Sequence, residues 1–395
     1  MVRASAQRLA GFGTSVFTEM SRLAVEHRAI NLGQGFPDFP GPDLVKEAAA
    51  RAIHADMNQY APSHGTPRLR HAIAATFGNT YGREIDPDAE ITVTTGATEA
   101  LQAAMLAFVD PGEEVIFFEP FYDAYPAQAV FAGGTPRAVR LQPPDWSFDP
   151  DELRRTVTSR TRAIVINTPH NPTGKMFSHE ELEFIAQVAV ERDLLVITDE
   201  VYDRITYDGS VHVPIALLPG MWERTVTINS TGKTFSMTGW KIGYAIAPAE
   251  LSRAIRGTHQ FITFATATPF QEAMAEALEV AESQGYYHDL ALKYTYLRNQ
   301  LRDALESAGL PVLPINGSYY LMADISGLGF ADDVSFCRYL TSEIGVAAIP
   351  PSAFYFDPST APLLARFCFA KRTETLAAAA ERLAGLPAAR PSPGT

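Results

Sequence analysis

Short runs of β-branched and other apolar residues alternate with segments of helical periodicity through the middle of the chain. This alternation is typical of a parallel sheet whose strands are joined by crossover helices. The runs predict seven strands, at Ile91–Thr95, Glu114–Phe118, Arg137–Arg140, Ala163–Asn167, Leu194–Asp199, Thr225–Asn229 and Gly243–Ala247. The helices expected between them include Glu99–Val109, Asp149–Val157 and Ser178–Glu191. Ser178 and Glu181 have the spacing of a capping box at the start of the last of these helices.

The pattern changes after about residue 285. A long amphipathic helix is expected at 286–308, a strand at 318–325, a helix at 332–343 and a strand at 364–369. Because 395 residues exceed the usual size of one core, we expect two domains. Residues 46–284 are expected to form a large α/β domain with a mostly parallel seven-stranded sheet, and residues 285–395 a smaller α/β domain that residues 1–45 join. Segment 386–395, rich in Pro, Ala and Gly, is expected to be a frayed tail.

The composition indicates a globular protein of the cytoplasm. The net charge of −13 argues against a nucleic-acid partner, because neutralising phosphates requires a basic surface. No stretch approaches the roughly 20 apolar residues of a membrane span, and residues 1–17 lack the apolar core of a secretion signal. The two cysteines, Cys337 and Cys368, lie in apolar sequence, which indicates that they pack in the core. No metal site is expected.

The stretch from Asn229 to Gly243 carries the clearest chemical signal. It places Lys233 and Lys241 among glycine, serine and threonine, although the whole chain has only six lysines. A lysine becomes a covalent catalyst when its amine condenses with an aldehyde, as in the Schiff base to pyridoxal phosphate. Ser230 and Lys241 would then suit the phosphate. Ser230 and Lys233 also form the Ser-x-x-Lys pair of serine acyltransferases, but the Ser-Asp-Asn and Lys-Thr-Gly partners of that class are absent.

Further polar groups follow other predicted strands, where ligands of open parallel sheets bind. Residues 95–99, Thr-Gly-Ala-Thr-Glu, join a strand to a helix and offer N–H groups to a phosphate, or form an ordinary N-cap turn. Asn171 presents an amide from a turn fixed by prolines. Asp199 is a strand-end carboxylate that needs a cation if it is buried, and a protonated pyridine nitrogen would serve. Tyr202 would reach the phenolic oxygen of the same ring.

These motifs together resemble a known family. Asn171-Pro-x-Gly, Asp199-x-x-Tyr202 and Ser230-x-x-Lys233 with Lys241, in this order, are similar to the class I and II aminotransferases, which are fold-type I pyridoxal phosphate enzymes. The resemblance covers nearly the whole chain. Segments 31–39 and 119–125 are similar to the subgroup that contains kynurenine, glutamine and methionine aminotransferases. Segments 259–264 and 268–271 most resemble its methionine-preferring bacterial members.

The resemblance implies how the cofactor would be held. Lys233 would form the Schiff base and then act as general acid and base, while Asp199 pairs with the pyridinium nitrogen. Asn171 and Tyr202 would contact the ring oxygen, and Tyr122 would stack on the ring. The phosphate would be held by the N–H groups of Ala97 and Thr98 and by the side chains of Ser230 and Lys241. Aspartate aminotransferases of this family commonly have an arginine at the position of Lys241. The lysine keeps the positive charge but cannot form the bidentate contact of an arginine.

The resemblance also implies the substrate contacts and the assembly. Arg366, in Arg-Phe-Cys-Phe, would bind the substrate α-carboxylate. The alternative is that Arg366 forms an ion pair at the surface. Gly35 would let the backbone close over the substrate. Tyr60 would reach the phosphate of a neighbouring subunit, which implies a homodimer. The bonds Glu119–Pro120 and Asn171–Pro172 are expected to be cis.

The leading hypothesis is therefore an aminotransferase with a ping-pong cycle between an amino acid and a 2-oxo acid. No second arginine is clearly placed for a distal carboxylate, whereas aromatic residues are candidates for an apolar pocket: Phe36, Tyr122, Tyr125, Phe261 and Phe264. This favours uncharged amino acids such as Met, Phe, Tyr, Gln or kynurenine, with succinyl-diaminopimelate left open. A cysteine-S-conjugate β-lyase would use the same lysine. A non-catalytic sensor of this fold is a further alternative, but the chain lacks the basic DNA-binding segment such regulators carry.

Overall fold

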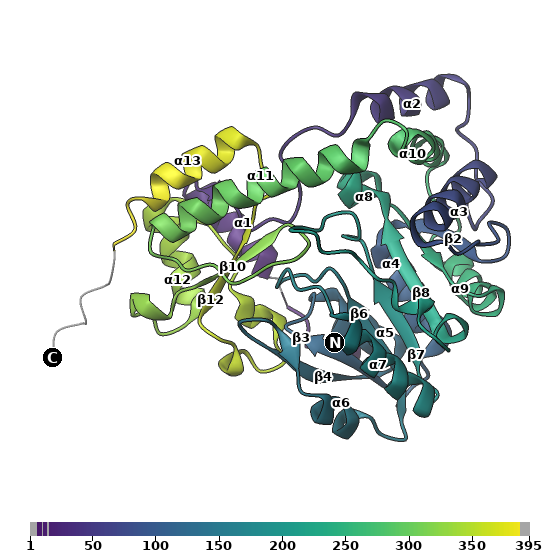
Figure 1. Ribbon diagram of the computed structural model, residues 1–395, viewed down its shortest axis with the longest axis horizontal. Coiled ribbons are helices and arrows are strands. Elements are labelled where there is room, and N and C mark those ends of the chain that lie inside the picture. The colour runs from purple at the N-terminus through teal and green to yellow at the C-terminus, as the bar shows by residue number, and fades with distance from the viewer. Residues whose placement is uncertain (1–5, 10, 14–15, 388–395) are drawn as a thin grey trace, which may run out of the picture.

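The computed structural model of the protein describes residues 6–9, 11–13 and 16–387. Its largest feature is an eight-stranded sheet, and Figure 1 shows how helices surround it. The strand order is β2-β9-β8-β7-β6-β3-β4-β5. The strands from β8 through β4 run parallel, whereas β9 is antiparallel to both β2 and β8, and β5 is antiparallel to β4. Their bounds are β2 Ile91–Thr95, β3 Glu114–Glu119, β4 Thr135–Gln142, β5 Ser147–Phe148, β6 Thr161–Asn167, β7 Leu195–Asp199, β8 Thr225–Ser230 and β9 Ile242–Ile246.

Seven of these strands overlap the seven predicted from the sequence. The prediction of a seven-stranded sheet is wrong by one strand, because β5 was not expected. β5 has only two residues, paired with Leu141 and Gln142 at the end of β4. A strand this short has no measurable period of alternation, so the sequence pattern does not reveal it.

Helices cover both faces of the sheet, because successive residues of a strand point to opposite faces. On β3, Val115 and Phe117 pack with α4, α5 and α9, whereas Ile116 and Phe118 pack with α6 and α7. A third group, α2, α3 and α10, packs against β2 and β9. The bounds of these helices are α2 Asp43–His54, α3 Pro67–Tyr81, α4 Gly96–Phe108, α5 Ala124–Ala132, α6 Pro150–Thr156, α7 His179–Glu191, α9 Ala249–Ile262 and α10 Thr268–Ala281.

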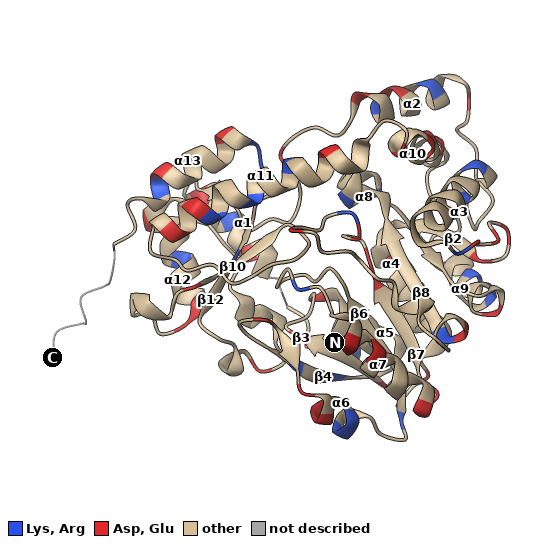
Figure 2. Cartoon of the chain, viewed as in Figure 1, with Lys and Arg blue, Asp and Glu red and all other residues tan. Residues whose placement is uncertain are grey.

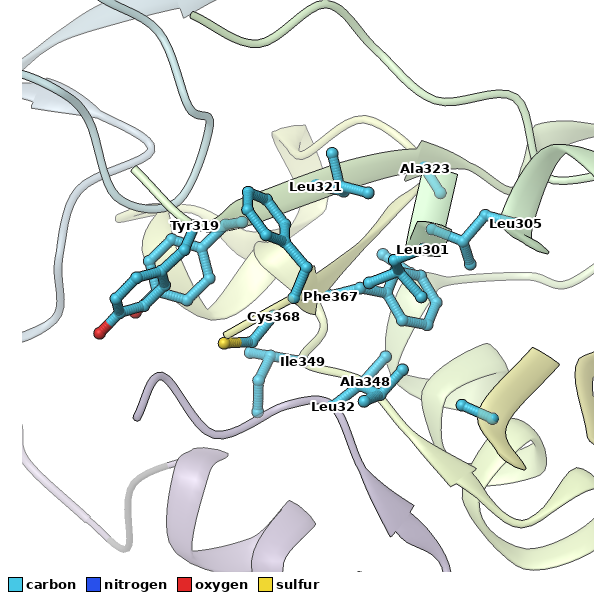
Figure 3. Packing of buried hydrophobic residues seen from close by; sticks show 14 of the residues in the cluster. Leu32, Leu301, Leu305, Tyr319, Leu321, Ala323, Ala348, Ile349, Phe367 and Cys368 are labelled. Carbon is cyan, nitrogen blue, oxygen red and sulfur yellow. The ribbon is translucent and has the colours of Figure 1, made fainter. Parts of the chain in front are cut away.

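A second group of elements, formed mainly by the C-terminal part of the chain, lies beside the sheet (Figure 1). Its strands β10 (Tyr320–Asp324) and β12 (Leu364–Cys368) are antiparallel. The short β1 (Ile30–Asn31) pairs with β11 (Val346–Ala347), which ties the N-terminal segment to this group. Its helices are α1 Val16–Glu26, α11 Tyr286–Ser307, α12 Asp333–Tyr339 and α13 Thr373–Leu383. Figure 3 shows part of its core, where Leu32, Leu301, Ile349 and Phe367 are buried together.

Most local predictions for these elements are confirmed. The capping box of α7 is present, since Glu181 N donates to Ser178 Oγ at 3.2 Å and Ser178 N donates to Glu181 Oε2 at 2.8 Å. The helix expected at 332–343 instead ends at Tyr339 and continues as a π-helical turn, Leu340–Ile344. Cys337 and Cys368 are free and buried, as expected. In the tail expected at 386–395, residues 388–395 lie outside the described part of the chain.

The predicted cis bonds before Pro120 and Pro172 are both confirmed, and Pro144 and Pro169 also follow cis bonds.

Charged residues lie mostly on the helices and loops around the sheet, and the strands at its centre carry few (Figure 2). None of the described helices is long and apolar enough to cross a lipid bilayer.

Candidate active site

A cavity of about 480 Å³ lies where several strands of the large sheet end and the first turn of α4 begins. It collects residues that are far apart in the sequence. Ten of the residues predicted for cofactor or substrate binding line it: Gly35, Ala97, Thr98, Tyr122, Asn171, Asp199, Tyr202, Ser230, Lys233 and Lys241. Two residues of the expected apolar pocket, Phe36 and Tyr125, line it as well. The other two predicted site residues, Arg366 and Tyr60, do not.

Lys233 extends into this cavity from α8 (Thr231–Thr234), a short helix that directly follows β8 and is capped by Ser230. Its Nζ donates a hydrogen bond to Tyr319 Oη at 3.1 Å, and Tyr319 Oη donates to the carbonyl of Gly35 at 2.6 Å. Burial lowers the pKa of Lys233 from its usual 10.5 to about 8. A substantial fraction of this amine is therefore uncharged near neutral pH, as a nucleophilic lysine requires.

Asp199, the last residue of β7, is a buried carboxylate at the floor of the cavity. Its Oδ2 accepts a hydrogen bond from Tyr125 Oη at 2.8 Å, and its Oδ1 accepts one from Val201 N at 3.3 Å. Burial raises the pKa of Asp199 to about 6. No lysine or arginine of the described chain forms an ion pair with it. A carboxylate in this position favours a ligand that brings its own positive charge.

A second corner of the cavity has the features of an anion site. Ser230 and Lys241 lie beside the N-terminus of α4, where the partial positive charge of a 13-residue helix is concentrated. Lys241 has a left-handed backbone (φ 57°), and its Nζ lies so close to Gly96 that a Cβ there would be 2.8 Å from it. Gly243 allows β9 to approach the backbone of Gly96 and Ala97, where any Cβ would overlap both. This corner suits a phosphate group.

Arg366 lies in β12 and is completely buried behind the cavity wall. Its Nη1 donates to Asn171 Oδ1 at 2.9 Å, and its Nη2 donates to the carbonyl of Gly33 at 2.7 Å. Its Nε has no hydrogen-bond partner among the described residues, and none of their carboxylates lies within ion-pair distance. The alternative of a surface ion pair is wrong for this residue. A buried guanidinium without an anion suits a ligand carboxylate, and Asn171 links it to the cavity.

The sequence alone did not reveal a pair of tyrosines that completes this wall. Tyr319 contacts Lys233 as described above, and Tyr320 Oη lies 3.2 Å from Tyr202 Oη. The Tyr320 ring also lies 4.2 Å from the guanidinium of Arg366. A Cβ at Gly35 would overlap the Tyr320 hydroxyl, so any larger residue there would require Tyr320 to move. No pattern within the sequence links these tyrosines to Lys233, which is 86 positions away from Tyr319.

Three aromatic residues lie outside the cavity. Tyr60 is 85% exposed and packs edge-on against Phe264, with ring centroids 5.3 Å apart. Phe261 is 90% exposed. The expectation that Phe261 and Phe264 line the substrate pocket is therefore wrong for the pocket of their own chain. Among the described residues, no three or more His, Cys, Asp and Glu side chains gather as they would around a metal ion.

Comparison with known proteins identifies the family. The family model for aminotransferase class I and II matches residues 27–383. Methionine aminotransferase of Escherichia coli is 45% identical over 378 residues, covering 95% of this chain and 97% of that protein. Kynurenine–oxoglutarate transaminase 1 of Homo sapiens is 42% identical over 410 residues, covering 96% and 97%.

Solved structures agree with this assignment. An Escherichia coli protein with methionine aminotransferase function superposes with a TM-score of 0.94 at 43% identity, covering 97% of this chain and all of that one. N-succinyldiaminopimelate aminotransferase of Mycobacterium tuberculosis gives a TM-score of 0.93 at 45% identity, with 97% and 100% covered. The chain therefore belongs to the class I and II aminotransferases, a family of fold-type I enzymes that depend on pyridoxal phosphate.

Proposed function

We propose that this aminotransferase moves the amino group of an uncharged L-amino acid, of the methionine, aromatic, glutamine or kynurenine type, to a 2-oxo acid by a ping-pong mechanism. One observation carries the proposal. The amine of Lys233 shares one site with two buried charges that form no ion pair among the described residues, the carboxylate of Asp199 and the guanidinium of Arg366. Pyridoxal phosphate and an amino acid would supply the missing charges, a pyridinium nitrogen and an α-carboxylate.

The residues of the cavity fit this cofactor group by group. Lys233 would hold it covalently, Asp199 would pair with its ring nitrogen, and Asn171 and Tyr202 would bind its ring oxygen. The phosphate would lie at the anion site formed by Ala97, Thr98, Ser230 and Lys241, and Tyr122 would stack on the ring. When bound, the cofactor supplies an electron sink for the negative charge that develops at the substrate Cα.

Lys233 is proposed to move the proton at Cα. Its lowered pKa lets the neutral amine accept a proton near neutral pH and return it later in the same half-reaction. Tyr319 holds this amine by a hydrogen bond and is itself fixed by the carbonyl of Gly35. These hydrogen bonds orient the free amine of Lys233 in the cavity wall. This fixed geometry is the condition for efficient general acid and base catalysis.

Arg366 is proposed to bind the α-carboxylate of both substrates. Opening its hydrogen bond to Asn171 would free Nη1 for a carboxylate oxygen, and a charged acceptor makes the stronger bond. Gly35 would lie over the substrate together with the Tyr320 ring. The side chain would extend among Phe17, Phe36, Tyr122 and Tyr125, which line the same cavity. One relative is named for methionine and another for kynurenine and oxoglutarate, and both names support an uncharged amino donor.

We also propose that the protein acts as a homodimer in the cytoplasm, with Tyr60 reaching the phosphate of the neighbouring subunit. The exposure of Tyr60, Phe261 and Phe264 on one chain supports this, because aromatic residues are enriched in protein–protein interfaces. We further propose the division into a segment 1–45, a large domain 46–284 and a small domain 285–395. The pairing of β1 with β11 supports the joining of the N-terminal segment to the small domain.

A half-reaction screen tests the proposed function. Each candidate amino acid is added alone to the purified, cofactor-loaded protein, and the absorbance change to the amine form of the cofactor is followed. Methionine, aromatic amino acids, glutamine or kynurenine are expected to react fastest, and Lys233→Ala provides the unreactive control. Rapid reaction of aspartate alone would contradict the proposed substrate class. No reaction with any amino acid would contradict transamination by this chain.

A further inference from the structure

Asp123 is an acidic residue of the cavity to which no role has been assigned above. It lies directly before α5, between Tyr122 and Tyr125, and all three residues line the cavity. Residues at this position before a helix commonly cap its first N–H groups. The side chain of Asp123 makes no such capping hydrogen bond. Its carboxylate is instead stabilised by the backbone N–H groups of Asp123 and Ala124 at the start of the helix.

No charged side chain of the described residues pairs directly with Asp123. No side chain of the described residues forms a hydrogen bond or ion pair with its carboxylate, which is stabilised only by nearby backbone N–H groups and, at longer range, by Arg366. Burial outweighs these contributions and raises the pKa of the Asp123 carboxyl. Asp123 is thus an acidic residue of the cavity wall that has no cationic side chain in direct contact among the described residues.

Among the described residues that line the cavity, no further cation could compensate a second anion beside Asp123. Its two lysines are Lys233, at the reacting end, and Lys241, at the anion site. Arg366 is the group proposed for the α-carboxylate. A substrate with a carboxylate at the end of its side chain would thus bring that charge into a cavity whose remaining ionisable group is Asp123. Like charges brought together in a partly desolvated site repel each other strongly.

We propose that Asp123 is a specificity-determining residue, whose carboxylate rejects amino acids with acidic side chains and accepts a hydrogen bond from neutral donors. This inference rests on the proposed function and specifies its substrate class. The amide of glutamine and the aryl amine of kynurenine are donors of the required kind. A thioether such as that of methionine neither gains from Asp123 nor is repelled by it.

Two unreactive ligands of nearly equal shape test this directly. Glutarate ends in a second carboxylate, whereas glutaramate ends in an amide, and neither has an amino group to transfer. Their dissociation constants are measured by calorimetry on the cofactor-loaded protein, for the parent chain and for Asp123→Asn. The variant is expected to bind glutarate about tenfold more tightly or better, since a like charge is removed. Glutaramate is expected to bind equally well or somewhat more weakly.

The control variant is Asp110→Asn, which removes the same charge from the exposed surface. It is expected to change neither dissociation constant. Asp123→Ser provides a second removal of the charge if asparagine disturbs folding or cofactor content, both of which are checked by circular dichroism and cofactor absorbance. Half-reactions with glutamate and methionine complete the test, because only the glutamate rate should rise.

Two results would overturn the assignment. If Asp123→Asn lowers both dissociation constants by the same factor, Asp123 acts only on the α-carboxylate site at Arg366. Unchanged affinity for both would mean that it does not face the substrate side chain. Suppose that the parent protein reacts with methionine, but Asp123→Asn leaves the ratio of the dissociation constants for glutarate and glutaramate unaltered. That result would refute this inference alone and leave the proposed function standing. A parent protein that reacts with no amino acid would refute the proposed function, and the binding ratio would still test Asp123.

Discussion

Replacing Asp199 with asparagine is expected to stabilise the cofactor-free protein and to weaken its hold on the cofactor. The two effects have one cause. Asp199 is buried at the end of β7 with only two neutral hydrogen-bond donors, Tyr125 Oη and Val201 N. Its negative charge is therefore a cost to the folded chain until a pyridinium nitrogen pairs with it. Asparagine has nearly the same shape without the charge.

The magnitude follows from the pKa of Asp199. Folding raises it from 3.8 to about 6, and each pKa unit corresponds to about 1.4 kcal/mol. Below pH 4 this carboxyl is protonated in both the folded and the unfolded chain, and the folded state has its full stability. As the pH rises through 6, the carboxyl ionises in the folded chain and that stability is lost. At pH 8 the ionised group should therefore cost the cofactor-free protein about 3 kcal/mol, and about half as much at pH 5. Asparagine removes this dependence on pH.

Denaturant unfolding of the cofactor-free parent and variant, at pH 5 and pH 8, measures this difference. The stabilisation by Asp199→Asn should be greater at pH 8. Tyr125→Phe serves as a companion, because loss of its hydrogen bond should destabilise the ionised carboxylate and act in the opposite direction at pH 8. Cofactor titration should show weaker binding to Asp199→Asn, and the half-reaction should be much slower. A variant less stable than the parent at both pH values would refute the reasoning.

Three further substitutions test other parts of the site. Lys233→Ala should abolish transamination yet retain noncovalent cofactor binding, seen by absorbance after dialysis, and near-normal turnover would contradict the central assignment. Gly243→Ala should strain the anion site by about 1–3 kcal/mol, since its Cβ would overlap the backbone of Gly96 and Ala97. That strain should lower the free energy of unfolding, measured with denaturant, whereas Gly239→Ala, where a Cβ meets no atom within 4 Å, should leave it unchanged. Tyr60→Phe should weaken cofactor retention by about 1.5–3 kcal/mol without dissociating the dimer, as light scattering and cofactor titration would show. A fully active monomer would contradict the role proposed for Tyr60.

Much of the fold could be predicted because its determinants are local. The alternation of apolar runs located seven strands of the large sheet, and Ser178 with Glu181 located the start of α7. Both signals arise within one turn or one strand, from side-chain periodicity and from satisfied N–H groups. The order of the sheet is not local. Nothing in the runs themselves indicates that β9 inserts antiparallel between β2 and β8, because each strand has the same pattern in either direction.

The candidate site, like the fold, has parts that the sequence predicts and parts that only the tertiary structure shows. The sequence located Lys233, Asp199 and Asn171, because each lies in a short motif at or shortly after the end of a strand. Only the tertiary structure decided their surroundings, since Tyr319 and Arg366 reach them from elements 86 and 195 positions away. It also revealed Asp123 in the cavity wall and placed Phe261 outside it. The sequence determines which reactive side chains are present and how they are spaced. Their burial and charge pairing depend on which distant segments pack together. Packing therefore sets the pKa values of Lys233 and Asp199 on which the chemistry depends.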